Sequence, residues 1–439
     1  MKTTTVRINY SIMKRFAFLF CGALILLSYS CSDIISSEKR QSSVDDFSVL
    51  TRDLTRSQNE VANTLLNFSI NYFKENYSDK TGNTGLSPFS LAMDISMLSL
   101  GASGQSYDEL TKALGFKGYD SDQIGEFYQT LSGRLKSDNM LSIANAVWFD
   151  NNYVENVKPA FREGMIGYFN SEIGSVDFVS AKSADLINGW ANSHTAGKID
   201  KIVLPQDLEN AVVVLTNAID FNGEWLNKSF MGERGIFYPV KGESSERDFF
   251  KGAGDGIREY NVSCKEKNDP SVIELKIDDR FSVFFLLPPE KLTLKRFVSS
   301  LNSADWVRWM ISMGPGRSAT KVTTFKIPCF QSVTEDDCVR QLMRMGVKSI
   351  FDTKTCDLSG IGPGPLAVTS VKQKSAVNMN SEGSSASSAT ASVISIFTSP
   401  GLPQDDTIET QEFLANRPFV YAIVEKSTQT ILFMGTVAE

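Results

Sequence analysis

The chain has 439 residues, of which 42% are apolar, with a formal net charge of -7 and one histidine. This composition is typical of a globular protein, and the length suits one large domain or two smaller ones. An acidic chain without a basic stripe disfavours nucleic acid as a partner, and the lack of a fixed-period repeat disfavours a solenoid.

The N-terminus has the pattern of a targeting segment. Lys14 and Arg15 precede the apolar run Phe16–Leu27, which is too short to span a bilayer and suits a signal-peptide core. Residues 1–30 are therefore expected to be a signal peptide. Cys31 follows small residues and resembles the lipid-attachment cysteine of a bacterial lipoprotein, and an ordinary secretory signal is the alternative.

This pattern predicts a lipid-anchored protein of a bacterial cell envelope that contacts the membrane through Cys31, or alternatively a secreted protein. The polar, serine-rich stretch 31–46 is interpreted as a tether, and one folded domain is expected over residues 47–439. No CxxC pair exists, and neither a metal nor another cofactor is expected. The spacing assigns no disulfide, and most of the other cysteines are expected to be small buried residues: Cys264, Cys329, Cys338 and Cys356.

Apolar residues at helical spacing dominate the first half of the chain. Ser87-Pro88 is a typical helix start, since proline near the first turn loses no hydrogen bond, and Gly101 is a typical end. The helices expected in this way lie within Phe47–Tyr77, Leu91–Leu100, Tyr107–Leu114 and Ile187–Ala196.

Strand patterns dominate the second half. Ala211–Ile219 is almost continuously apolar, which predicts a central strand covered on both faces, and Leu141–Phe149 predicts a buried strand before a turn. This mixture without regular alternation indicates an α+β fold. Further strands are expected at Val272–Ile277, Phe281–Leu287, Val322–Ile327, Phe419–Val424 and Ile431–Val437, and surface loops at Gly252–Gly256, Gly314–Gly316 and Gly362–Gly364.

The single histidine argues against an enzyme, because a Ser-His-Asp or Cys-His site would have to use His194. That residue lies at the end of a polar helix and is expected to be a surface or capping histidine. We find no catalytic constellation in the sequence.

Several short motifs, in order along nearly the whole chain after residue 47, resemble the serpin family. The first is Leu86–Ser90 followed by Met97–Ala102, and the last is Leu432–Gly435. Between them lie Ser142–Ala146, Ile187–Trp190 with Gly197–Ile199, Leu215–Ile219 with Phe221–Trp225, and Arg417–Phe419.

The resemblance implies a serpin fold, with a large mixed or antiparallel main sheet, helices packed around it, smaller barrel-like sheets and an exposed reactive-centre loop at about 381–416. A serine protease cleaves this loop, which then inserts into the main sheet and traps the acyl-enzyme. The resemblance places the loop hinge at Glu382, Gly383, Ser384, Ala386, Ser388 and Thr390, and the region where the sheet opens at Ser87, Ser90, Asn217 and Gln373.

The resemblance implies a scissile bond about fourteen residues past Gly383, which is Phe397–Thr398 and suits chymotrypsin-like or elastase-like proteases. A shifted register would offer Ile396, Thr398 or Val393, which favour elastase-like or subtilisin-like enzymes. The protein is expected to act as a monomer, and a non-inhibitory serpin that acts as a binding protein is the alternative function.

The sequence departs from the family pattern at three places. The glutamate expected two residues before Gly383 is Ser381, although Glu382 is adjacent. The histidine expected where the sheet opens is Gln373, whose amide can still donate and accept hydrogen bonds. The arm after the scissile bond, residues 398–416, is longer than usual.

Overall fold

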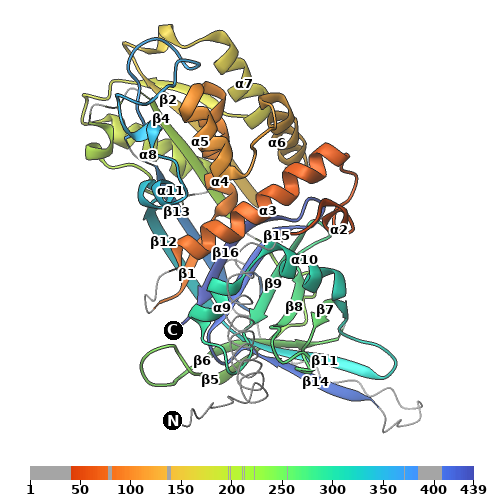
Figure 1. Cartoon of the computed structure of the whole chain (residues 1–439). Coiled ribbons are helices and arrows are strands. Elements are labelled where there is room, and N and C mark those ends of the chain that lie inside the picture. The colour runs from red at the N-terminus through yellow and green to blue at the C-terminus, as the bar shows by residue number, and fades with distance from the viewer. Residues whose placement is uncertain are drawn as a thin grey trace, which may run out of the picture.

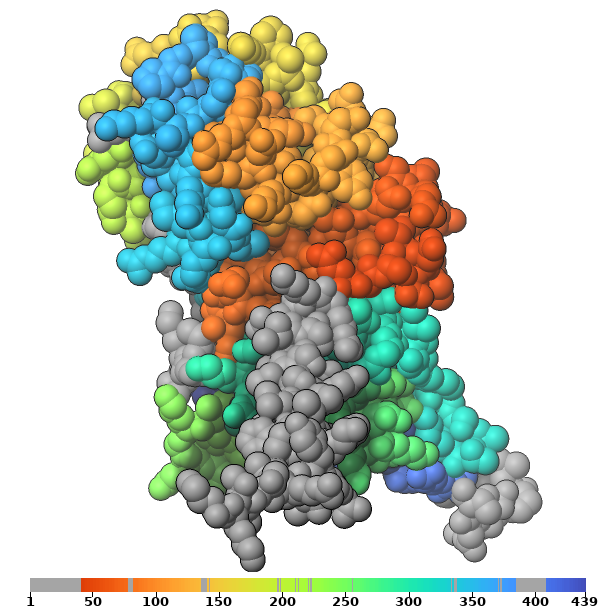
Figure 2. Space-filling view, viewed as in Figure 1, coloured from red at the N-terminus to blue at the C-terminus, as the bar shows by residue number. Residues whose placement is uncertain are grey.

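The computed structural model describes residues 41–77, 82–135, 140–195, 197, 199–209, 211, 213–221, 223–254, 256–369, 371–383 and 408–439. Within these ranges no helix is long and apolar enough to cross a membrane. Helices α3, α5 and α6 contribute to the red-to-orange band across the face shown in Figure 2. The α-helices are α2 (Val44–Ser48), α3 (Arg56–Asn76), α4 (Pro88–Gly101), α5 (Gly104–Leu114), α6 (Ser121–Leu135), α7 (Pro159–Phe169), α8 (Ser183–His194), α9 (Leu294–Ser300), α10 (Ser303–Ser312) and α11 (Val339–Arg344).

The strands are concentrated in the second half of the chain, as the sequence predicts (Figure 1). They are β1 (Thr84–Leu86), β2 (Leu141–Asp150), β3 (Glu172–Val176), β4 (Val213–Phe221), β5 (Met231–Phe237), β6 (Ser245–Ala253), β7 (Ile257–Tyr260), β8 (Ser271–Lys276), β9 (Phe281–Leu287), β10 (Gly314–Pro315), β11 (Lys321–Pro328), β12 (Phe330–Asp337), β13 (Lys372–Met379), β14 (Glu409–Leu414), β15 (Phe419–Glu425) and β16 (Thr430–Val437).

These strands form four sheets. The largest is antiparallel throughout, with the order β1-β16-β15-β9-β8-β7-β10. A second sheet has the order β14-β11-β6-β5, and two small sheets have the orders β3-β2-β4 and β12-β13. Among the described strands none of these sheets closes into a barrel, so the barrel-like sheets that the resemblance implies are open.

Some element boundaries differ from those predicted. The expected helical region from residue 47 is two helices, α2 and α3, and α2 begins at Val44. Ser42 is buried, and its backbone N–H donates to the Ser303 hydroxyl at 3.1 Å. The folded body therefore includes part of the stretch that we interpreted as a tether. Two predicted glycine-rich loops are also partly strand, because Gly252 and Ala253 belong to β6 and Gly314–Pro315 pairs with β7 as strand β10.

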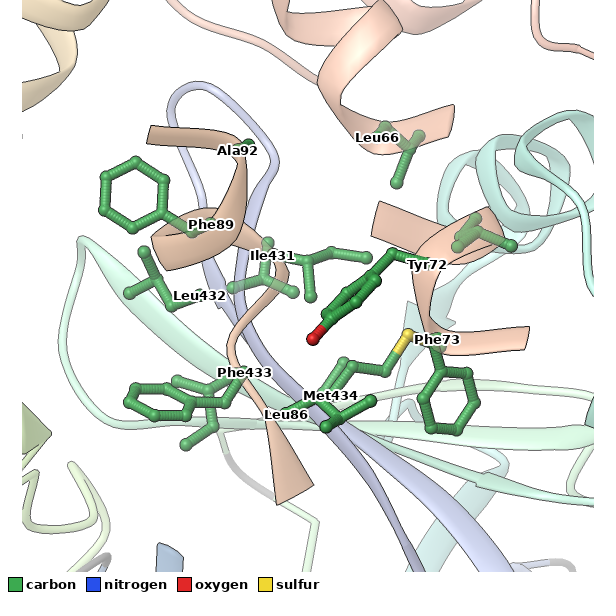
Figure 3. Packing of buried hydrophobic residues seen from close by; sticks show 14 of the residues in the cluster. Leu66, Tyr72, Phe73, Leu86, Phe89, Ala92, Ile431, Leu432, Phe433 and Met434 are labelled. Carbon is green, nitrogen blue, oxygen red and sulfur yellow. The ribbon is translucent and has the colours of Figure 1, made fainter. Parts of the chain in front are cut away.

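Helix α4 crosses the middle of the molecule and is buried on nearly all sides, because almost all of its residues are apolar or small. Its first turn packs against α3 and β16. Figure 3 shows Phe89 and Ala92 of α4 facing the end of β16, with Tyr72 of α3 beside them. The start of α4 is thus fixed inside the main core.

The main sheet that the resemblance implies consists of two halves, β3-β2-β4 and β12-β13. Strands β4 and β13 lie close to one another but belong to different sheets. The described residues join them by one isolated bridge, between Glu224 and Gly383, just beyond the ends of both strands. The two halves are therefore unpaired along the lengths of β4 and β13.

Helix α8 covers the outer face of β3-β2-β4 through a small apolar cluster that is separate from the main core. The side chains of Ala144, Ala146 and Ala218 on the strands meet Ile187 and Trp190 of α8. Because the strand residues at this contact are small, the helix lies close to the sheet.

Candidate functional site: the divided sheet and the loop hinge

The predicted hinge begins in a tight turn that is attached to the segment after β4. The side chain of Asn380 accepts hydrogen bonds from the backbone N–H groups of Glu382, at 2.8 Å, and Gly383, at 3.1 Å. Trp225, which is fully buried, donates its backbone N–H to the carbonyl oxygen of Glu382 at 3.1 Å and its indole N–H to that of Asn380 at 2.8 Å. This turn therefore fixes where the loop leaves the sheet.

Gly383 is required at this turn. Its φ of +147° lies outside the range that other residues adopt, and a Cβ atom would lie 2.1 Å from the carbonyl oxygen of Gly223. The hinge glycine predicted from the sequence thus lies at the end of the boundary between β4 and β13 where the single bridge joins the two sheets.

The first turn of α4 is bonded to both halves of the divided sheet. On one side, the amide of Gln373 on β13 accepts from the backbone N–H of Ser87 at 3.2 Å and donates to the Ser87 carbonyl oxygen at 2.6 Å. It also accepts from the Tyr72 hydroxyl at 3.3 Å. The Gln373 amide thus bonds both backbone groups of Ser87, because an amide side chain carries a donor and an acceptor together.

On the other side, the Ser90 hydroxyl donates to the Asn217 side chain of β4. Asn217 in turn donates to the side chain of Asn145 on β2 at 2.5 Å, and Asn145 donates to the Phe169 carbonyl oxygen at 2.9 Å. We call the contacts of Ser87 and Ser90 with Gln373 and Asn217 the clasp.

The structure brings together all four residues predicted for the sheet-opening region, and it adds partners that the sequence did not single out. Tyr72 appeared only as one apolar position of a helix, although its hydroxyl lies at the clasp. Trp225 and Asn145 lie within motifs of the family resemblance, so their presence was noted without their contacts. The alternation along β13, with Gln373 and Ser375 buried and Lys374 half-buried, was the signal that could have oriented this strand.

Other predicted residues lie outside the described part of the chain. These are the lipid-attachment position Cys31, the hinge residues Ser384, Ala386, Ser388 and Thr390, and the bond Phe397–Thr398. The end of the predicted loop is a strand, because Glu409–Leu414 forms β14 and runs parallel to β11. The long arm after the scissile bond is therefore partly a sheet element.

His194 lies at the end of α8, half-exposed, as predicted. Its Nε2 is 3.0 Å from the carboxylate of Glu172, and its Nδ1 is 2.8 Å from the carbonyl oxygen of Trp190. A carbonyl oxygen only accepts, so Nδ1 must carry a hydrogen and cannot take a proton from the Ser193 hydroxyl 3.2 Å away. These contacts hold the helix end and do not form a Ser-His pair.

The cysteines differ from the prediction that most are buried. Of the four in the described residues, only Cys338 is buried, Cys264 is exposed and the other two are intermediate, and none of the four forms a disulfide. Burial is the main cause that raises the pKa of Cys329, and likewise of Cys356, to about 11. Both thiols therefore stay protonated at neutral pH.

Comparison with known proteins gives a consistent result. A family model described as "Serpin (serine protease inhibitor)" matches residues 63–439. A putative serpin-Z6C of Oryza sativa subsp. japonica is 28% identical over 82% of this chain and 91% of its own length. The leukocyte elastase inhibitor of Bos taurus is also 28% identical, over 81% of this chain and 92% of its own length.

Solved structures show the same fold at lower identity. The thermophilic serpin tengpin in its native state gives a TM-score of 0.75 at 23% identity, covering 92% of this chain and 98% of that one. Thyroxine-binding globulin in complex with thyroxine gives 0.72 at 20% identity, with coverages of 87% and 99%. With the family model matching most of its length, this chain belongs to the serpin family of serine protease inhibitors.

Proposed function

We propose that this protein is a suicide-type inhibitor of serine proteases, which traps the acyl-enzyme by inserting its cleaved loop into the main sheet. The observation that carries this proposal is the unpaired boundary between β4 and β13, with the loop hinge at its bridged end. A strand that enters there can pair with both neighbours, which gains hydrogen bonds along two edges.

The sequence of the loop supports insertion. No charged residue occurs from Gly383 to Gln404, and no proline occurs from Gly383 to Ser399. A proline would remove a ladder hydrogen bond, and a buried unpaired charge would cost about 3–5 kcal/mol. The alternate residues after the hinge glycine, all small, are Ser384, Ala386, Ser388, Thr390 and Ser392.

The reaction then follows from ordinary serine protease chemistry. The protease serine attacks the carbonyl carbon of Phe397, the bond to Thr398 breaks, and the new amine leaves with a proton from the protease histidine. The loop, now an ester on the protease, is free at its cut end and can insert between β4 and β13. Insertion carries the protease along, and distortion of its active site prevents hydrolysis of the ester.

Two observations favour a chymotrypsin-like or elastase-like target. Leukocyte elastase inhibitors are among the relatives that cover most of this chain. Phe397 suits an apolar specificity pocket, and neither Lys nor Arg occurs between Gly383 and Gln404.

Incubation with chymotrypsin and with elastase tests the proposal. We expect an SDS-resistant adduct of inhibitor and protease, and intact mass spectrometry should show one released peptide that begins at Thr398. If the loop is cut and the protease is released fully active, the protein is a non-inhibitory serpin, and the proposal is wrong. Release of a peptide that starts elsewhere would keep the mechanism and correct the bond.

A further inference from the structure

The carboxylate of Glu172, on the edge strand β3, lies against the last two turns of α8. The indole N–H of Trp190 donates to its Oε2 at 3.0 Å, and Nε2 of His194 lies 3.0 Å from its Oε1. The rings of Trp190 and His194 are also in contact, with their centroids 4.8 Å apart. This carboxylate therefore attaches the end of α8 to the edge of the sheet.

Both ring nitrogens of His194 face oxygen atoms that accept hydrogen bonds. Nδ1 lies 2.8 Å from the carbonyl oxygen of Trp190, and Nε2 faces the carboxylate of Glu172. A neutral imidazole has only one N–H group, so either tautomer would leave a nitrogen lone pair directed at an acceptor. The imidazolium ion has two N–H groups and satisfies both contacts at once. The geometry around His194 therefore fits the protonated ring.

The proton of this pair belongs on the imidazole and not on the carboxylate. An ordinary histidine keeps its proton to a pH about two units higher than an ordinary glutamate does. The indole of Trp190 also donates to Glu172, and such a donor stabilises the ionised carboxylate. In the described part of the chain Glu172 is the carboxylate that pairs with the ring. The other neighbours are uncharged: the Ser193 hydroxyl, and Trp148 of β2 packed edge-on against Trp190.

A positive charge at this position also suits the helix. His194 is the last residue of α8, and a cation in the last turn of a helix is stabilised by the helix dipole. The protonated ring donates from Nδ1 to the carbonyl oxygen of Trp190 in the same turn. A neutral ring lacks both the interaction with the dipole and the attraction to Glu172. Binding of one proton therefore strengthens the attachment of α8 to β3.

We propose that His194 and Glu172 form a pH-sensitive contact, which holds the end of α8 on β3 when the imidazole is protonated and loosens when the proton is lost. It responds over the range in which histidines titrate, about pH 5 to 8. The side chains are 36% and 58% exposed, so the effect is that of a partly exposed ion pair. The contact goes beyond the proposed function, because it requires neither the loop nor a protease.

Hydrogen exchange of the α8 amides tests this contact in the full chain without a histidine tag. We would follow exchange by mass spectrometry at about pH 5.5 and about pH 8, corrected for the effect of pH on the chemical exchange rate. In the wild type, the last two turns should exchange about two- to fivefold more slowly at the lower pH. In H194Q and E172Q this difference should disappear. H194K carries its charge at both pH values, so it should be protected equally at both.

D185N is the matched control, because it removes an exposed carboxylate from the first turn of the same helix. It should keep the wild-type difference. Since the chain has one histidine, its ring gives a single Cε1–H signal in proton NMR, and protection of α8 should rise in step with the protonation of that ring. The proposal is overturned if the wild type shows no difference between the two pH values, if H194Q, E172Q or H194K keeps the difference, or if D185N loses it.

Discussion

Asp94 is a buried carboxyl group in the middle of α4, one helical turn beyond Ser90 of the clasp. It is 8% exposed, and in the described part of the chain its Oδ1 has no hydrogen-bond partner. Burial raises the pKa of Asp94 to about 8. The titratable group that interacts with it is Tyr128 of α6, whose own pKa is raised mainly by burial and further by Asp94. A charged carboxylate here would lack both water and a counter-ion.

Stability should therefore fall as the pH rises towards 8. The folded pKa of Asp94 is raised above its unfolded value near 3.8, so between these values the native state binds a proton that the unfolded state lacks. The stability that protonated Asp94 preserves is fully present below about pH 4. It is lost as the pH rises towards 8, at about 1.4 kcal/mol per pH unit. In urea unfolding across pH 5 to 9, D94N should gain stability relative to the wild type up to about pH 8 and hold a constant difference above it.

A second variant separates the charge from the shape of the side chain. D94A also lacks a titratable group but leaves a small cavity. Its free energy of unfolding relative to the wild type should therefore follow the same pH slope as that of D94N, shifted by a constant amount. A pH-independent difference for both variants would show that Asp94 is already ionised in the native state.

At the scale of elements, the sequence predicted the fold class and the most apolar elements, and it missed many of the others. Runs such as Phe281–Leu287 are apolar on both faces, so their pattern alone indicates a buried strand, and the structure has β9 at these residues. Helix α6 was missed although its sequence carries the signal, since Ile124, Phe127 and Leu131 follow helical spacing. Strand β12 carries acidic residues at its end, which disfavour a strand in a local pattern.

The clasp shows why the candidate site was only partly predictable. Ser87 and Gln373 are far apart in the sequence, and no local pattern shows that one amide satisfies both backbone groups of the other residue. The family resemblance supplied the region, and only the packed structure supplied the contacts. Hydrogen bonds between distant segments depend on how the elements pack, which periodicity does not report.

The clasp makes a prediction about β13 as an element. In Q373A the backbone N–H of Ser87 loses its partner inside the core, whereas the Ser87 carbonyl still accepts from the backbone N–H of Leu91. One buried unpaired group costs about 1–3 kcal/mol. We expect a lower urea midpoint for the native protein. N378A is the control, because Asn378 lies on the opposite face of the same strand and is half-buried. Equal losses in the two variants would mean that Gln373 contributes only through strand packing.

At the scale of the whole molecule, the hinge turn at Trp225 and the clasp connect the two halves of the main sheet in the described part of the chain. None of these contacts pairs β4 with β13 along their length. The native fold therefore leaves the facing edges of β4 and β13 without ladder hydrogen bonds. In the proposed mechanism, the free energy gained when the cleaved loop fills this place distorts the protease.

A single charged residue in the loop should prevent insertion without affecting recognition of the loop by the protease. Thr390 is predicted to face the core after insertion, so T390R would bury an unpaired charge at a cost of about 3–5 kcal/mol and slow insertion. The protease should still cleave the loop, but it should escape by hydrolysis of the ester, with little adduct. In the wild type, cleavage should raise the melting temperature markedly, and in T390R much less.

A389R is the matched control, because the neighbouring residue faces the opposite side of the inserted strand. It should keep most of the adduct and most of the rise in melting temperature. Identical behaviour of the two variants would mean that the loop does not enter the sheet in the predicted register.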